Sequence, residues 1–296
     1  MLLIEYLSNI SVLLFPIASM FAVGLSFTFS EILGPLRYPD RVFRAFVANF
    51  ILVPLLALGI TRLFAFDSSL TTGMVLVGMA AGAPFLLKLT QTANADVSLG
   101  ASLLVLLMPL TVIYMPLVVP LVIKGVSVNT VGIAIPLVLT MLLPLLVGHL
   151  LDSIFPRLAL RLQPIARQTS TIALVIIVVT SLVLNGPLFR ELFGTGAVMG
   201  AILLTIGGFG IGYLISSQGF NRRAVMGLGT GQRNIAAALV VASQDFDDPK
   251  ILTMVVLFSV VDLMVLFPIA MILRRRATPP RYNATYRPNA GYAQQH

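Results

Sequence analysis

Two cationic side chains, Lys88 and Arg233, lie inside apolar stretches, each shortly after a cluster of glycine or proline residues. Gly82 and Pro84 precede Lys88, and the segment 227–232 that precedes Arg233 contains three glycines. A central lysine or arginine costs about 2.5–3.5 kcal/mol on membrane-insertion scales, so such a residue is usually functional or paired. We interpret both residues as candidate charges at an anion-binding site.

The elements that carry these charges are expected to be transmembrane helices. The 296-residue chain is 58% hydrophobic and 10% charged, with a mean hydropathy of +0.99. Soluble domains carry about 25% charged residues. The chain has no Cys and two His, which excludes thiolate chemistry and leaves little for a metal site. The high pI of about 10.3 does not indicate nucleic-acid binding, because the arginines cluster between apolar runs.

Nine apolar stretches are long enough to span a bilayer, which takes about 20 residues each. They lie at 10–29, 42–61, 70–92, 97–123, 130–150, 170–186, 194–216, 223–243 and 250–273. Alternate loops and the C-terminal tail hold 13 of the 19 Lys and Arg residues. This distribution predicts an external N-terminus and a cytoplasmic C-terminus, in a plasma membrane or a bacterial inner membrane.

The expected division of the chain has four parts. The first half is 1–152, with four spans, and an amphipathic connector follows at 153–168, with the end of the fifth span before it. The second half is 169–276, and a disordered cytoplasmic tail is expected at 277–296. The connector is basic and is expected to rest on the membrane surface.

The third and eighth spans are interrupted at corresponding places. A shift of 149 positions places Gly82 on Gly231 and Asp96 on Asp245. Broken helices at matching positions of two repeats indicate the central site of a transporter. Non-helical backbone survives at membrane depth only where protein, water or ligand satisfies its polar groups. The alternative is that these glycines are only close-packing surfaces between helices.

The segment GLGTGQRNIAAALVVA at 227–242 resembles the E-x-G-x-Q-N signature of the bile acid:sodium symporter family. Weaker matches are MFAVGLSFTFSEI, VANFILVPLLA and NADVSLGASLLVLLMPL, and the resemblance extends over about 10–273. It implies an all-α integral membrane fold, an inverted-repeat helix bundle with core and panel modules and two broken crossing helices. It also implies alternating access between the modules.

The chain departs from the family at the sodium ligands. The positions that the resemblance aligns with those ligands are occupied by Gly229, Arg233, Leu86, Leu87, Gly100, Leu104 and Asn49, and Asn234 is retained. Sodium needs oxygen ligands, and a fixed arginine beside it would repel it. The departures therefore predict a divergent member with nine spans that lacks most sodium ligands.

Lys88 and Arg233 are expected to stand where sodium stands in relatives. The alternatives are that Lys88 extends to the membrane interface and that Arg233 only ties the broken backbone together. Asp262, central in the last span, could pair with either cation or carry a proton. The candidate binding residues are Lys88, Arg233, Asn234, Gln232, Gly82, Pro84, Gly229, Thr230, Gly231, Asn49 and Asp262; Thr90, Gln91 and Asn94 are candidates for the cavity lining.

The predicted function is secondary-active or facilitative transport of a small organic anion, with no enzymatic activity, cofactor or metal. The chain lacks a G-x-x-x-x-G-K-[ST] motif, and coupling to protons or to no ion is favoured over sodium. One alternative is a sodium-coupled symporter of bile-acid-like anions with a rearranged ion site. Another is a membrane sensor that keeps the fold without transporting. An intramembrane enzyme is disfavoured, because no paired acids or deep histidine ligands occur.

Overall fold

The computed structural model describes residues 2–26, 38–123, 130–216 and 219–276, and these residues form helices and no strand. In this part of the chain, seven segments are long and apolar enough to cross a membrane. They are Ile4–Gly24, Pro39–Leu63, Val97–Val122, Thr130–Ile154, Pro156–Leu184, Ala197–Ile215 and Pro249–Arg274. The other two predicted spans, 70–92 and 223–243, are interrupted, and neither contains a single helix of membrane length.

The helices follow one another with short connections. In chain order they are α1 (Leu2–Gly24), α3 (Pro39–Phe46), η2 (Val47–Leu52), α4 (Val53–Leu63), α5 (Ser68–Met79), α6 (Leu86–Thr92), α7 (Val97–Val122), α8 (Thr130–Leu137), η3 (Val138–Leu142), α9 (Leu143–Ile154), α10 (Pro156–Leu184), α11 (Gly186–Gly194), α12 (Ala197–Ile215), α13 (Phe220–Gly231), α14 (Ile235–Gln244) and α15 (Pro249–Arg274). The predicted tail at 277–296 lies outside the described residues.

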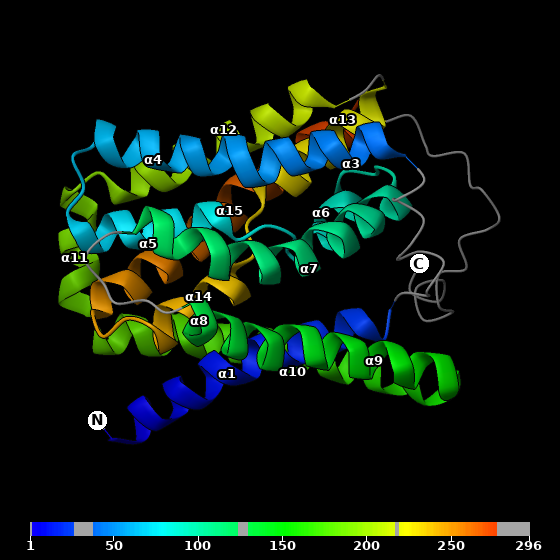
Figure 1. Ribbon diagram of the computed structural model, residues 1–296, viewed down its shortest axis with the longest axis horizontal. Coiled ribbons are helices and arrows are strands. Elements are labelled where there is room, and N and C mark those ends of the chain that lie inside the picture. Colours follow the sequence, from blue (N-terminus) through cyan, green and yellow to red (C-terminus); the bar gives the residue numbers. More distant parts are fainter. Residues whose placement is uncertain (1, 27–37, 124–129, 217–218, 277–296) are drawn as a thin grey trace.

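The helices form two layers, which Figure 1 shows one above the other. The panel consists of α1, α8, η3, α9 and α10, in which α1 packs against both α9 and α10. The core consists of the remaining spans, and its helix α14 contacts α1 and α8 of the panel. Both broken helices, α5–α6 and α13–α14, belong to the core.

The two broken spans run in opposite directions through the core. The first leaves helical geometry at Ala80 and resumes at Leu86, and the second is interrupted at 232–234. Gly82 has φ +76°, a left-handed conformation that glycine adopts without steric cost. The backbone N–H of Asn234 donates to Ala80 O at 2.9 Å, so the two breaks touch.

Prolines widen two of the other spans into π-helical segments. Pro54 follows η2 and Pro144 follows η3, each at the start of the next α-helix. A proline has no N–H for the carbonyl four residues earlier, and its ring pushes that carbonyl aside. In η2 this frees carbonyls that face the crossing, as described below.

The segment 153–168 is not a separate element. Residues 156–168 are the first turns of α10, which continues without interruption to Leu184. A helix of 29 residues is about 43 Å long, more than the roughly 30 Å of bilayer hydrocarbon, so its basic end can extend into the interface while the rest spans. The short helix α11 between α10 and α12 was not predicted as a separate element.

Candidate functional site

The ends of broken helices leave carbonyl groups without helical partners at the crossing. The last four carbonyls of any α-helix lack an intrahelical N–H. At the end of α5 these include Gly78, and the non-helical residues Ala81 and Gly82 follow. All of these residues are buried, so their oxygens need donors from elsewhere in the protein.

Arg233 donates to carbonyls at the end of α5. Its side chain is fully buried, and its guanidinium carries five N–H groups. The five contacts are Nε to Val77 O at 3.2 Å, Nη1 to Asn49 Oδ1 at 3.0 Å and Thr230 O at 3.2 Å, and Nη2 to Gly78 O at 2.6 Å and Asn49 O at 3.5 Å. Every N–H therefore has a protein acceptor, and none is left to contact a ligand directly.

Asn49 orients the guanidinium from the η2 segment. Its amide nitrogen donates to Ala45 O at 3.0 Å and to Thr230 Oγ1 at 3.2 Å, which turns its amide oxygen toward Arg233. Asn49 and Thr230 are themselves fully buried. The second span and the eighth span are thus joined through polar side chains at the crossing.

Asn234 satisfies the other side of the first break. Its amide oxygen accepts from Ala237 N at 3.2 Å and caps α14, while its amide nitrogen donates to Ala81 O and Gly82 O at 3.3 and 3.0 Å. An asparagine suits this position because one amide group both accepts and donates. The residue that the sequence retains from the family signature therefore bridges the two breaks.

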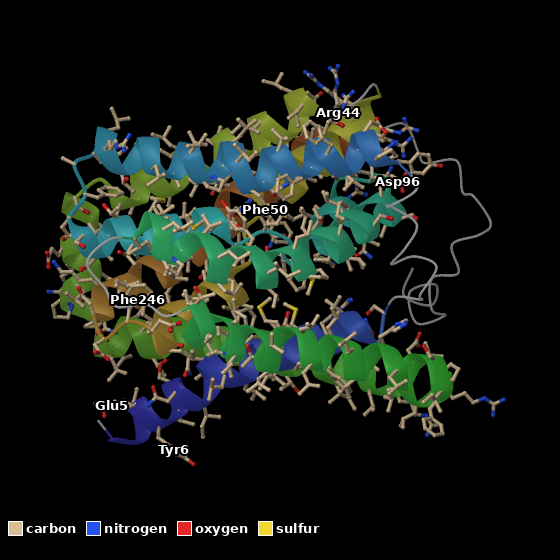
Figure 2. The ribbon with its side chains drawn as sticks, in the orientation of Figure 1. Glu5, Tyr6, Arg44, Phe50, Asp96 and Phe246 are labelled. Carbon is tan, nitrogen blue, oxygen red and sulfur yellow. The ribbon has the colours of Figure 1, made fainter. Side chains whose placement is uncertain are left out.

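Two donors at the site, Thr111 and Tyr114 of α7, were not predicted. The Thr111 hydroxyl donates to Ala81 O at 2.9 Å and accepts from Ala81 N at 3.0 Å. The Tyr114 hydroxyl donates at 2.7 Å to Phe50 O, the carbonyl that Pro54 leaves free. Phe50 is buried in the core layer, where Figure 2 labels it. The sequence signal that was available is the spacing of Pro54, four residues after Phe50.

Asp262 is buried on α15 and forms no ion pair within 4.0 Å with Arg233 or Lys88, all three being described residues. Its carboxylate accepts a hydrogen bond from Thr205 of α12 at 3.3 Å. The Asp262 carboxylate interacts with the backbone of Arg233, and it interacts electrostatically with the more distant guanidinium. The ion pair between Asp262 and a cationic side chain, one of the two roles considered for it, is therefore not found among these residues.

Lys88 does not join the network of Arg233. It lies on α6 with an exposed side chain, whereas its neighbours Leu89 and Thr90 are buried. Pro84 lies at a half-buried turn just before α6. Gln232 ends α13 with its side chain buried and its Oε1 without a hydrogen-bond partner, and Gly231 packs against α12.

The position aligned with the family's signature glutamate is packed by leucines. A Cβ added at Gly229 would lie 2.4 Å from Leu103 Cδ2 and 3.0 Å from Leu86 Cδ2. Leu86 and Leu104, at two other positions that the resemblance aligns with sodium ligands, are fully buried in apolar clusters. This region offers hydrocarbon side chains where a sodium site needs oxygen atoms.

Outside the spans, one carboxyl group has an altered acidity. Asp245 lies between α14 and α15, at the end of the molecule opposite to Arg44 and Asp96, as the neighbouring Phe246 shows in Figure 2. Burial raises the pKa of Asp245 from its ordinary value to about 6, and its Oδ2 has no hydrogen-bond partner.

The crossing of two antiparallel broken helices inside a bundle of apolar spans is typical of secondary transporters. Residues 12–192 match the family model described as the Sodium Bile acid symporter family. This match covers more than half of the chain, and the chain therefore belongs to the sodium bile acid symporter family, a family of transporters. It is a multi-pass integral membrane protein.

Three curated relatives extend the comparison. The probable sodium/metabolite cotransporter BASS1, chloroplastic, of Arabidopsis thaliana is 25% identical over 235 residues, covering 78% of this chain and 58% of the relative. BASS5 of the same organism, with the same description, is 26% identical over 247 residues, covering 78% and 60%. BASS2 of Oryza sativa subsp. japonica is 24% identical over 241 residues, covering 78% and 56%. The chain spans about three fifths of the length of these relatives.

Proposed function

We propose that this protein transports a small organic anion by alternating access between core and panel, with the buried charge of Arg233 in place of a bound sodium ion. The observation that carries the proposal is the fully buried guanidinium, whose five N–H groups are all bonded to oxygen acceptors at the crossing. A cation is already present there and cannot leave.

The oxygen acceptors around Arg233 support the proposal that its guanidinium replaces a sodium ion. Four of the five are backbone carbonyls and the fifth is an amide oxygen, which is the kind of oxygen that also coordinates alkali ions. At an effective dielectric constant of about 20, two unit charges 4 Å apart repel by about 4 kcal/mol. A sodium ion beside the guanidinium is therefore disfavoured.

The leucines around Gly229 support the same proposal for the other ion position. A glutamate at position 229 would collide with Leu103 and Leu86, so the ligand and its space have both been replaced. Restoring the single glutamate is not expected to restore an ion site. Of the two positions that the resemblance aligns with sodium ligands here, position 233 is filled by a cation and the space at position 229 by leucine side chains.

The charge also supports an anionic substrate. A buried positive charge creates a field that is weakly screened in the interior, and Arg233 can act through that field although its N–H groups are occupied. The exposed Lys88 on α6 is the candidate for direct contact with an anion. Asp262, buried and without a direct cationic partner, is the candidate carrier if a proton moves with the substrate.

The test is uptake into proteoliposomes from pooled carboxylates, sulfonates and sterol acids, with sodium and proton gradients imposed separately. We expect uptake that is the same in sodium and in choline buffers. Arg233→Gln is expected to abolish uptake while the protein is still expressed, and Arg190→Gln, on exposed α11, is the matched control. Stimulation by a sodium gradient would overturn the proposal.

The second candidate function is sodium-coupled cotransport with a rearranged ion site. The relatives are named probable sodium/metabolite cotransporters, and that naming favours it. Sodium-stimulated uptake would select this function. Specific ligand binding without uptake of any pooled anion would instead select the membrane sensor. The predicted orientation, with the N-terminus outside, is tested separately by protease accessibility of the termini in oriented vesicles.

A further inference from the structure

The panel contains an apolar groove that is separate from the crossing. Its volume is about 520 Å³, and it is formed by α1, by η3 with α9, and by the first half of α10. The residues that line it are mainly aliphatic or aromatic, with one threonine, Thr169. They include Ala18, Phe21, Leu143, Val147, Leu162 and Ile165.

The groove opens away from the core. Met141 and Leu145 face Met108 of α7 on the core side, where all three line a small void. Leu143 and Val147 lie two residues further along the same helix, which at about 100° per residue places them on the opposite face. Their side chains are about half exposed, at 49% and 47%. In a membrane this face meets acyl chains, not the translocation path.

Close helix crossing next to the groove holds its walls in place. A Cβ added at Gly24 of α1 would lie 2.2 Å from Leu145 O, and one added at Gly148 of α9 would lie 2.6 Å from Phe21 O. The two helices can approach this closely only because both positions lack a side chain. Two walls of the groove are therefore closely packed against each other, and α10, the third wall, packs against α1.

Positive charge lies at one end of the groove. Arg157 and Arg161 are exposed on successive turns at the start of α10, and Arg161 is one turn before Ile165 of the groove lining. The segment 149–167 contains three arginines and one acidic residue. Ile154 and Phe155, both 57% exposed, add apolar surface at the same turn. Basic and apolar side chains together are the composition of a membrane-interface site for anionic lipid.

We propose that this groove binds a phospholipid with an anionic headgroup, with an acyl chain along the groove and the phosphate at Arg157 and Arg161. The apolar lining matches the chain, and the arginines match the headgroup in charge and in their ability to form paired hydrogen bonds to phosphate. On the predicted orientation the lipid belongs to the cytoplasmic leaflet. Such a lipid contacts α1, α9 and α10 together and stabilises the panel as one unit.

The proposal is tested by native mass spectrometry of the full chain in detergent, titrated with phosphatidylglycerol or phosphatidylcholine. We expect one phosphatidylglycerol to bind preferentially. The double variant Arg157→Gln, Arg161→Gln is expected to weaken phosphatidylglycerol binding about thirtyfold, the size of two interfacial arginine contacts, and to leave phosphatidylcholine binding unchanged. Arg190→Gln removes an exposed charge from α11, which follows the C-terminal end of α10 and lies far from the groove, and is the control for loss of charge.

A second variant tests the groove itself. Thr169→Phe places a ring in the groove and is expected to weaken binding of both lipids, whereas Gly210→Phe, where an added Cβ has no neighbour within 4 Å, adds similar bulk elsewhere. Equal binding of the two lipids by the wild type would overturn the proposal, as would undiminished phosphatidylglycerol binding in the double arginine variant. A protein dimer that Thr169→Phe dissociates would also overturn it and assign the groove to a second copy.

Discussion

The two broken helices occupy corresponding places in the sequence, yet they contribute opposite groups to the crossing. The first break, 80–85, offers backbone carbonyls and the apolar side chains of its Ala, Pro and Phe residues. The second break, 232–234, offers the polar side chains of Gln, Arg and Asn. Arg233 and Asn234 donate to residues at the end of α5 and in the first break.

The comparison shows that two breaks at corresponding positions of the backbone can carry different side chains and still form one site. Both breaks expose polar backbone at membrane depth, where an unsatisfied group costs several kcal/mol. Asn234 on the second break and Thr111 of α7 donate to the carbonyls of the first break, and Arg233 donates to the end of α5 and to Thr230 O before its own break. The repeats can therefore diverge in sequence as long as every carbonyl keeps a donor.

The largest expected effect comes from removing the donor that joins the breaks. Arg233→Ala removes the hydrogen bonds that the buried oxygens of Gly78, Thr230 and Asn49 accept from the guanidinium, whereas Val77 O keeps its bond from Ala80 N. We expect the free energy of unfolding to fall by about 3–5 kcal/mol, because unsatisfied buried groups cost about 1–3 kcal/mol each and solvent recovers a part. The measurement is the thermal unfolding midpoint in detergent.

Two further variants sharpen this prediction. Arg233→Lys keeps the charge but has three N–H donors for five acceptors, so an intermediate loss is expected. Lys88→Ala, on the exposed side of α6, is expected to change stability by less than about 0.5 kcal/mol. Equal losses for Arg233→Ala and Lys88→Ala would mean that the donors do not hold the crossing together.

The next largest effect distinguishes the matching glycines of the two breaks. A Cβ at Gly82 would lie 2.7 Å from Met108 N, and Gly82 has φ +76°. Gly231 is not among the described glycines with positive φ, and its nearest backbone atoms lie 3.1 Å from an added Cβ. We expect Gly82→Ala to destabilise by about 2–3 kcal/mol and Gly231→Ala by about 1 kcal/mol. Thermal unfolding of both variants checks this, and the reverse order would show that strain is not concentrated in the first break.

The smallest effect concerns the carboxylates that follow the breaks. Asp96 accepts from Leu99 N and caps α7, whereas the corresponding Asp245 has a buried Oδ2 without a partner and a pKa raised to about 6. A raised pKa in the folded state means that stability is lost as the pH rises through about 6, because ionisation is easier in the unfolded chain.

Asp245→Asn removes that ionisation. We expect the variant and the wild type to unfold alike near pH 4, and the variant to be more stable at pH 7 by less than about 1 kcal/mol, since a half-buried group is partly screened. Unfolding midpoints between pH 4 and pH 8 measure the difference. Asp247→Asn, at an exposed neighbour, is the control, and a variant that is less stable at pH 7 would contradict the assigned cause.

Much of the fold was predictable because it depends on apolar length and on backbone-breaking residues. The seven membrane-length helices follow from hydropathy, and both breaks follow from Gly and Pro beside polar residues. The continuity of α10 was not predictable, because a basic, Pro-containing segment is equally compatible with a surface connector. Pro164 is nevertheless accommodated inside that helix.

The site was predictable only in part. Arg233, Asn234 and Asn49 stand out as polar residues in apolar runs, and the structure joins them. Thr111 and Tyr114 give no periodic signal, and their acceptors lie 30 and 64 residues away in sequence. The direction of Lys88 depends on the phase of the seven-residue helix α6, where an error of one residue moves a side chain by about 100°.

The covalent attachment of the Arg233 charge has a thermodynamic consequence. A bound sodium ion can be released on the other side of the membrane and so drive a substrate uphill, whereas a guanidinium on the chain remains with the protein through every cycle. With no ion moving, a monovalent anion would reach only its own electrochemical equilibrium. A membrane potential of 100 mV, negative inside, is worth about 2.3 kcal/mol per charge. At that equilibrium the anion is about fiftyfold more concentrated outside, so an uncoupled cycle would favour export.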